Sequence, residues 1–225
     1  MSILWKDKNS NNRRKPEHII IRDCYGRRFK RILKNLTVSN KGTCLELASG
    51  EGFWTQFLAK SFSTLATDTS TYMLEKNNHT NKEILHLPKI SKESESFDLV
   101  FEANILHHIE DHQKVIDEMI RVSRRYIILI EPNRNNPLNI ILGLILKHER
   151  KSLKFNYNFI NKCLDPQKVR LINYESCGLL PPNKTPKLIW KLFRFLDNKI
   201  PLFGLDHCFV LEKVSGKHHL QSLGC

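Results

Sequence analysis

The chain has 225 residues, a formal net charge of +13 and 40% hydrophobic residues. This length fits one domain with a full core, and no apolar run is long enough to span a membrane. The first residues show no apolar segment followed by a cleavage site, so a cytoplasmic protein is expected. The six cysteines form no C-x-x-C pair, and Cys44 and Cys208 lie in strand-like runs, which favours free buried thiols.

The charge is unevenly distributed. Residues 45–133 hold nine Lys and Arg against fourteen Asp and Glu, whereas the rest of the chain holds 27 against nine, a net of +18. Basic flanks of this kind attract nucleic acid, an anionic membrane surface or an acidic small substrate. They also serve solubility alone as solvated faces, so charge by itself leaves these alternatives open.

The chain opens with a polar stretch and then a helical pattern. Residues 1–14 are predicted to be a flexible basic tail. From Pro16 to Lys34, apolar residues at helical spacing predict an amphipathic helix or helix pair, whose ordinary role is core packing. The apolar positions are Ile19, Ile20, Cys24, Tyr25, Phe29, Ile32 and Leu33. The predicted basic outer face consists of Arg27, Arg28, Lys30, Arg31 and Lys34.

The segment TCLELASGEGFW, residues 43–54, predicts a strand, a tight turn and a helix over residues 53–62. Its pattern is Glu46-x-Ala48-x-Gly50-x-Gly52, with Ser49 also in the run of small residues. Such a turn places helix-start N–H groups and bare backbone beside a ligand at the strand tip. An ordinary βα turn is the alternative.

A second strand is predicted over residues 63–67, ending in Asp68, which stands 22 residues after Glu46. A carboxylate at this strand tip accepts two hydrogen bonds from a ribose diol. Thr69 or Ser70 offers a helix cap, and Tyr72 and Met73 offer an apolar cover for an adenine face. An aspartate that only caps the next helix is the alternative interpretation.

Together these features resemble the first motifs of class I S-adenosylmethionine (SAM)-dependent methyltransferases of the small-molecule type, with Ala48 in place of their first glycine. The resemblance covers residues 40–136 with specific motifs and 137–214 in outline. It implies SAM as cofactor, a leading helix that helps close the pocket, and a Rossmann-like α/β fold. That fold is a doubly wound seven-stranded sheet of order 3-2-1-4-5-7-6 with the last strand antiparallel.

The resemblance also assigns cofactor contacts along the chain. A third strand is predicted over residues 83–86, with His86 and Leu87 at the adenine edge. After a fourth strand over residues 97–101, backbone carbonyls of the next residues would hold the methionine ammonium group. The expected cofactor-binding residues are Glu46, Ala48, Ser49, Gly50, Gly52, Asp68, Thr69, Met73, His86, Leu87, Glu102, Ala103, Asn104 and His107.

The cluster HHIEDH, residues 107–112, carries the candidate chemistry. His108 and His112 are four residues apart, but no third ligand is indicated, so no metal site is predicted. His107, His108 or Glu131 is the candidate general base for a hydroxyl or carbon acid. The alternative is that the histidines only shape the pocket. A long helix with a buried apolar stripe is expected to follow.

A fifth strand, YIILI over residues 126–130, leads into EPNRNNP. Because Pro132 and Pro137 interrupt regular structure, this segment is predicted to be a loop at the active edge. Glu131, Asn133 and Arg134 are the residues expected to face the substrate, and plain loop structure is the alternative.

The remaining segment is expected to determine specificity. The run PLNIILGLIL, residues 137–146, is a lid helix, part of the core or a shallow interfacial contact, in that order, so peripheral membrane contact stays open. Helices are predicted over 156–164 and 187–196, and strands over 169–176 and 208–214. Residues 15–214 would form one domain, with 137–200 as its substrate-cap elements and 215–225 as a flexible tail.

The predicted reaction is methyl transfer to a small-molecule or lipid-like acceptor, at oxygen or carbon. The fourth strand is followed by EANI and not by the [DN]-P-P-[YF] element of enzymes that act on amino groups of bases, and neither the fourth nor the fifth strand ends in cysteine. A tRNA or rRNA methyltransferase that uses the basic flanks is one alternative. A non-catalytic SAM-binding regulator is the other, and the oligomeric state is left open.

Overall fold

A computed structural model describes residues 13–37, 41–197 and 203–214. The predicted tails, residues 1–14 and 215–225, fall almost wholly outside these ranges. The strands are β1 (Thr43–Leu47), β2 (Ser63–Asp68), β3 (Lys82–Ile84), β4 (Phe97–Ala103), β5 (Ser123–Pro132), β6 (Val169–Cys177) and β7 (Asp206–Lys213). The α-helices are α1 (Ile19–Leu33), α2 (Thr55–Ser61), α3 (Thr71–Lys76), α4 (His112–Val122), α5 (Pro137–Ile145), α6 (Tyr157–Cys163) and α7 (Lys187–Phe193). The 3₁₀ segments are η1 (Leu106–His108), η2 (Lys147–Lys154) and η3 (Arg194–Leu196).

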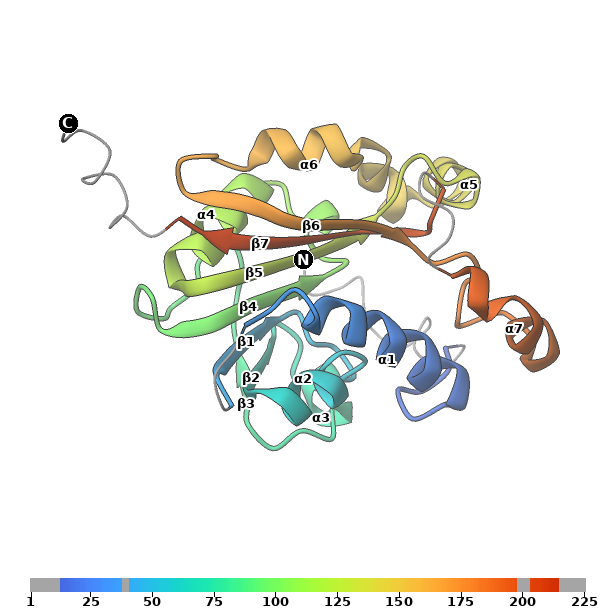
Figure 1. Ribbon diagram of the computed structural model, residues 1–225, viewed down its shortest axis with the longest axis horizontal. Coiled ribbons are helices and arrows are strands. Elements are labelled where there is room, and N and C mark those ends of the chain that lie inside the picture. Colours follow the sequence, from blue (N-terminus) through green and yellow to red (C-terminus); the bar gives the residue numbers. More distant parts are fainter. Residues whose placement is uncertain (1–12, 38–40, 198–202, 215–225) are drawn as a thin grey trace.

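The seven strands form one sheet in the order β3-β2-β1-β4-β5-β7-β6, which confirms the predicted topology (Figure 1). β1 to β5 pair in parallel, and β7 runs antiparallel to both β5 and β6. The carboxyl ends of β1, β2, β4 and β5 therefore meet at one edge of the sheet, where α/β proteins bind ligands.

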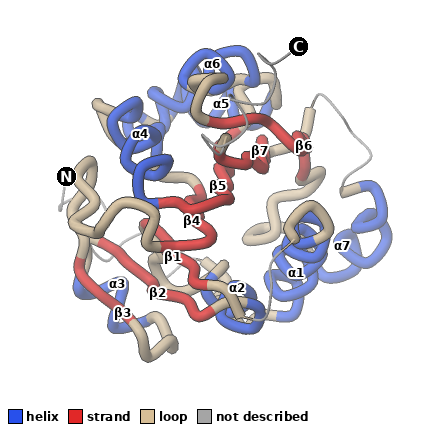
Figure 2. The backbone as a smooth tube through the Cα atoms, turned by 60° about the vertical axis from the view of Figure 1, so that its left-hand side comes forward, coloured by secondary structure: helices blue, strands red, loops and turns tan. Residues whose placement is uncertain are grey.

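Helices cover both faces of the sheet (Figure 2). On one face, α4 and α6 pack over a cluster that includes Leu45, Val100 and Phe209. On the other face, α1 and α2 pack over a cluster that includes Trp54 and Phe101. Burial on both faces explains why β1, β4 and β5 read as continuous apolar runs in the sequence.

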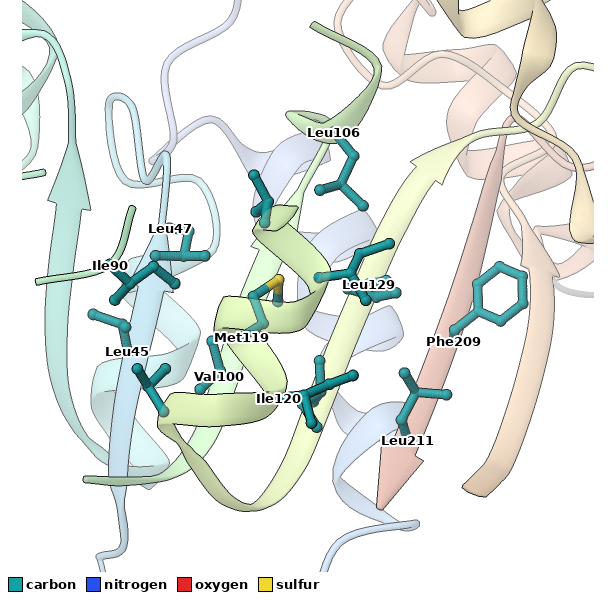
Figure 3. Close-up of a cluster of buried hydrophobic side chains, with 14 of the residues drawn as sticks. Leu45, Leu47, Ile90, Val100, Leu106, Met119, Ile120, Leu129, Phe209 and Leu211 are labelled. Carbon is teal, nitrogen blue, oxygen red and sulfur yellow. The ribbon is translucent and has the colours of Figure 1, made fainter. Parts of the chain in front are cut away.

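The predicted apolar stripe after the HHIEDH cluster forms the buried face of α4. Figure 3 shows Met119 and Ile120 of this helix turned toward Val100 and Leu129 of the central strands. Met119 is fully buried and Ile120 is nearly so. The helix begins at an N-cap, Asp111, whose side chain accepts a hydrogen bond from the Lys114 N–H.

The fifth strand is longer than predicted. β5 continues through Glu131 and Pro132, which pair with His207 and Asp206 of the antiparallel β7. The prediction that Glu131 lies on a loop is therefore wrong, because a strand from the far end of the chain extends the pairing. Smaller differences from the predicted bounds occur elsewhere. α2 begins at Thr55, two residues later than predicted, and β3 ends at Ile84, two residues earlier than predicted.

The basic outer face predicted for α1 needs one correction. Arg28 is buried, and its Nη1 donates to Asp206 Oδ2 at 2.7 Å while its Nε lies 3.5 Å from Asp197 Oδ2. Arg28 therefore ties α1 to the segments around β7, since a buried guanidinium requires carboxylate partners.

The cysteines follow the prediction where the structure describes them. Cys24, Cys44, Cys177 and Cys208 are buried and free, and Cys163 is free and half-buried. Cys225 lies outside the described residues. Across residues 13–37, 41–197 and 203–214, no helix combines the length and the apolarity needed to cross a bilayer.

Candidate active site

The turn after β1 has three residues in the left-handed region: Ala48 at φ +51°, Gly50 at φ +53° and Gly52 at φ +92°. A Cβ on Gly52 would lie 2.7 Å from the Asn77 Oδ1, so this glycine is required for packing. A Cβ on Gly50 would meet no atom within 4 Å. The turn therefore leaves open space beside Gly50, where a ligand can approach the backbone.

Asp68 lies directly against this turn. Its Oδ2 accepts a hydrogen bond from the Gly50 N–H at 2.9 Å, and its Oδ1 accepts one from the Ser70 N–H at 2.9 Å. Burial raises the pKa of Asp68, and the two N–H donors oppose that shift. Each carboxylate oxygen keeps a second lone pair, so Asp68 retains acceptor capacity for hydroxyl groups of a ligand.

Gly50 and Asp68 line a cavity of about 660 Å³ at the carboxyl ends of β1, β2 and β4. Its size is typical of small-molecule and cofactor sites. Ten of the expected cofactor residues line it: Ala48, Ser49, Gly50, Asp68, Thr69, Met73, His86, Leu87, Ala103 and Asn104. The candidate base His108 lines it as well.

Part of the cavity lining is apolar. Leu85, Leu87, Met73 and Ile109 belong to it, and the Thr69 Oγ1 is 2.7 Å from the His86 Nδ1. Apolar walls with a few placed polar groups suit a flat heteroaromatic ring. The resemblance placed the adenine edge at His86 and Leu87, and both residues line this cavity.

Four predicted cofactor residues do not line the cavity: Glu46, Gly52, Glu102 and His107. Glu46 is 2% exposed, and its Oε2 has no hydrogen-bond partner. Burial raises its pKa to about 8, against a hydrogen bond from Thr55. Glu46 therefore lies beneath the turn as a support, and the expectation of a direct contact needs correction.

Glu102 is fully buried inside β4, where its Oε1 accepts a hydrogen bond from the Ile130 N–H at 3.1 Å. Burial first, and then the negative charge of Glu131, raise its pKa well above the ordinary value. The Glu102 side chain thus points into the sheet and not to the cavity, and the contact expected of its backbone carbonyl stays a prediction. The strand continues to Ala103, which brings Ala103 and Asn104 to the cavity instead.

Of the three candidate bases, His107 and Glu131 are buried away from the cavity, whereas His108 lines it. His107 is 2% exposed, and its Nδ1 lies 2.6 Å from the Glu131 Oε2. Burial lowers the pKa of His107, but Glu131 and then Glu149 outweigh it and raise the pKa to about 9. His107 is thus a buried cation near neutral pH and not a free base. Glu131, also fully buried, is not a base at the cavity either.

Glu131 instead positions the segment that carries the histidines. Its Oε1 accepts hydrogen bonds from the Ile105 and Leu106 N–H groups at 2.9 and 2.8 Å. Its other oxygen binds His107, so one carboxylate fixes three consecutive residues after β4. The next residue, His108, faces the cavity, and its ring centroid lies 3.9 Å from that of His107.

Glu149 of η2 is a site residue that the sequence did not indicate. Its Oε2 lies 3.5 Å from the His107 Nε2, on the side opposite Glu131. Ligand atoms of His107, His108 and Glu149 all lie within 4.8 Å of one another, and this group does not include His112, which the sequence paired with His108. Because carboxylates flank both ring nitrogens of His107, the geometry is that of an ion triad.

Three further residues that line the cavity were not among the residues predicted from the sequence. Tyr25 of α1 lines it, in agreement with a leading helix that helps close the pocket. Arg13 and Asn183 line it from segments that are far away in the sequence. No local pattern marks such residues, because only the tertiary fold brings them to the cavity.

The substrate residues expected after β5 lie elsewhere. Asn133 is fully buried, and its Nδ2 donates to the Ser176 Oγ at 3.3 Å, so the prediction of a direct substrate contact is wrong. Arg134 is exposed and lines a second cavity of about 570 Å³ together with Asn135, Ile140, Leu153 and Phe203. Arg134 thus stays a prediction, for a different cavity.

The fold and the cavity define an α/β protein that holds a nucleotide-like cofactor at the carboxyl ends of its central strands. Residues 45–129 match the family model of a methyltransferase domain. The match begins in β1 and ends in β5, so it contains the turn, Asp68 and the histidine segment. Residues 45–129 are therefore those of a methyltransferase domain, and SAM is its cofactor.

Solved structures with the same fold agree. A Haloferax volcanii methyltransferase, solved in complex with the Trm112 methyltransferase activator, has a TM-score of 0.63 at 14% identity, over 88% of this chain and 93% of that one. A SAM-dependent methyltransferase from Mesorhizobium loti has a TM-score of 0.61 at 12% identity, over 85% and 99%. One from Thermotoga maritima has a TM-score of 0.62 at 12% identity, over 87% and 91%. No curated protein sequence matches the chain.

The lining residues fit SAM in chemistry. Gly50 leaves room that a Cβ would fill, and Asp68 offers acceptors for a ribose diol. Asn104 adopts φ +60° directly after β4, where the chain turns beside the cavity. Carbonyl oxygens at this place suit an ammonium group.

Proposed function

We propose that the protein transfers a methyl group from SAM to a small-molecule or lipid-like acceptor, at oxygen or carbon. The observation that supports this most is the single cavity that contains Gly50, Asp68 and His108. A cofactor site and a titratable imidazole thereby share one space. When bound, SAM supplies an electrophilic methyl group and departs as a neutral thioether.

His108 is the proposed base. An imidazole titrates near neutral pH and accepts a proton from a hydroxyl or an activated carbon acid as the acceptor's electron pair forms its bond to the methyl carbon. His107 and Glu131 are proposed as positioning residues, because they hold the segment that carries His108. The rest of the rate enhancement comes from the alignment of donor and acceptor and from the exclusion of water.

Each cofactor residue is proposed to contact a particular portion of SAM. Gly50, Ser49 and Ala48 would contact the cofactor through the turn backbone, and Asp68 would bind its ribose. Met73, His86 and Leu87 would enclose the adenine, with Thr69 beside them. Ala103 and Asn104 would hold the methionine ammonium group.

Labelled SAM tests the acceptor class. The protein is incubated with labelled SAM and a total small-molecule extract, and separately with bulk RNA, while SAM binding is measured by calorimetry. The proposal expects saturable SAM binding and label that partitions into an organic phase. A His108→Asn variant should keep SAM binding and lose most of the transfer, whereas Glu83→Gln, an exposed change outside the cavity, should alter neither.

The alternatives give different results in the same experiment. A net charge of +18 outside residues 45–133 favours RNA as the second candidate acceptor. In that case label would enter RNA, and RNA affinity would fall steeply with salt. Saturable SAM binding without label in either pool would indicate a regulatory SAM-binding protein.

A further inference from the structure

Helix α5 is attached to the protein by its polar side. The Asn139 Nδ2 donates to the backbone carbonyls of Asn133 and Leu205 at 3.0 and 2.6 Å. Gly143, one turn later, is the buried residue of the helix, and a Cβ there would lie 2.6 Å from the Leu153 side chain. These two positions make the inner face of α5.

The opposite face of α5 is apolar and exposed. Every leucine and isoleucine of the helix is exposed by between 40% and 71%: Leu138, Ile140, Ile141, Leu142, Leu144 and Ile145. At about 100° per residue they cover an arc of roughly 200°. A surface helix of a water-soluble protein places its apolar stripe inward, so α5 has the reverse arrangement.

Two neighbouring features extend this surface. Phe203, 53% exposed, lies beside α5, since its carbonyl accepts a hydrogen bond from the Asn136 Nδ2 at 2.6 Å. The segment η2 follows α5 directly and packs against it through Leu153. Four basic residues of η2 are exposed: Lys147, Arg150, Lys151 and Lys154. We call α5, Phe203 and these four basic residues the α5 surface.

The α5 surface lies at the edge of the sheet that carries the cofactor cavity. α5 leaves the carboxyl end of β5, and α7 leaves the carboxyl end of β6, which runs in the same direction as β5. Figure 1 shows both helices at the same end of the molecule. α7 also exposes apolar residues, among them Leu188, Leu192 and Phe193, between Lys187, Lys191 and Arg194.

We propose that the α5 surface binds the surface of an anionic lipid bilayer. At nine residues, α5 is too short to span the hydrocarbon layer and lies in its interface instead. Exposed apolar side chains followed directly by four exposed basic residues match the chemistry of acyl chains below anionic headgroups. Its connection to methyl transfer rests on the proposed function: a lipid-like acceptor would reach the cavity from the bilayer.

A second copy of the chain is the competing occupant, and charge disfavours it. A two-fold contact places each surface against itself. The four basic residues of η2 would then crowd against their own copies, whereas an anionic bilayer neutralises them.

Vesicle sedimentation tests the proposal without any need for activity. The full-length protein is mixed with vesicles of phosphatidylcholine alone or with added phosphatidylglycerol. Binding should require phosphatidylglycerol. Leu144→Asp with Ile145→Asp should lower the partition coefficient at least about tenfold. Lys147→Gln or Arg150→Gln should each lower it about fivefold.

The control is Val214→Asp. Val214 is 42% exposed, but it follows β7, whose antiparallel course ends at the opposite edge of the sheet. This variant should bind vesicles as the wild type does. Leu144→Ser with Ile145→Ser serves if the double aspartate variant does not fold, and SAM titration of each variant reports separately on the proposed function.

Three results would overturn the proposal. The wild type could stay in the supernatant with both kinds of vesicle. The double variant could bind as well as the wild type. Finally, sedimentation velocity could show a wild-type dimer that the double variant dissociates, without vesicle binding, which would assign the α5 surface to self-association.

Discussion

His107 and Glu131 form a buried ion pair that joins the segment after β4 to the end of β5, with 2.6 Å between Nδ1 and Oε2. Neither residue lines the cavity, yet together they hold the backbone that presents His108 to it. The pair therefore serves the site through position, and its loss should affect both stability and catalysis.

Glu131→Gln should lower the free energy of unfolding by about 3 kcal/mol, because it leaves the His107 cation buried beside one remaining carboxylate. Urea unfolding near neutral pH measures the change. Glu110→Gln is the matched control, since the Glu110 side chain is 93% exposed and should shift stability by less than about 0.5 kcal/mol. Equal stabilities of the two variants would argue against the pair.

The same pair predicts a pH dependence. The folded pKa of His107 is about 9, above the unfolded value of 6.5, so its stabilising contribution is complete below pH 6.5 and is lost as the pH rises through 9. The loss amounts to about 3 kcal/mol at most. Unfolding measured between these pH values should show the decline.

Glu46 also makes the free energy of unfolding fall as the pH rises, but over a lower pH range. Its pKa rises from 4.5 to about 8, so stability falls as the pH rises through that interval. The difference between wild type and Glu131→Gln removes the Glu46 part, because Glu46 is present in both. A difference that does not change with pH would contradict the assignment.

Ala48→Gly should stabilise the protein by about 1 kcal/mol, because Ala48 adopts φ +51°, where a Cβ is strained. Ala66→Gly is the opposite case, since Ala66 is buried in β2, where its backbone conformation does not require glycine. It should destabilise by about 1 kcal/mol. Thermal unfolding of both variants checks the difference in sign.

Asp68→Asn should weaken SAM binding at least about tenfold, since a neutral amide forms weaker hydrogen bonds to ribose hydroxyls than a carboxylate does. The amide oxygen still accepts the Gly50 N–H, so the turn should remain folded. Calorimetric titration gives the affinity, and Glu83→Gln, an exposed carboxylate of β3, is the control. Unchanged affinity in Asp68→Asn would remove this residue from the site.

The sequence was sufficient for the sheet and for the placement of Gly50 beside Asp68. Gly50 and Asp68 follow consecutive parallel strands, so local pattern and spacing placed them together. The extent of β5 was not predictable in the same way, because Pro132 signals a break and the pairing with Asp206 of β7 arises only in the fold.

Burial of polar groups was the hardest feature to predict. Glu102, Glu131 and Asn133 follow buried strands and appeared to be site residues, but tertiary packing encloses them. Glu149 reaches His107 from a segment 42 residues later, and no periodicity marks that contact. The apolar run of α5 left a lid helix, a core helix and an interfacial contact open, and only the fold shows that its apolar side faces outward.

Titration of SAM into the wild type and a Gly50→Asn variant tests the central claim most directly. Asparagine tolerates φ +53°, and its side chain would enter the open space beside the turn. We expect one saturable site in the wild type, and loss of binding with an unchanged thermal midpoint in the variant. Absence of SAM binding by the wild type, or equal affinity in both proteins, would contradict the assignment of this cavity to the cofactor.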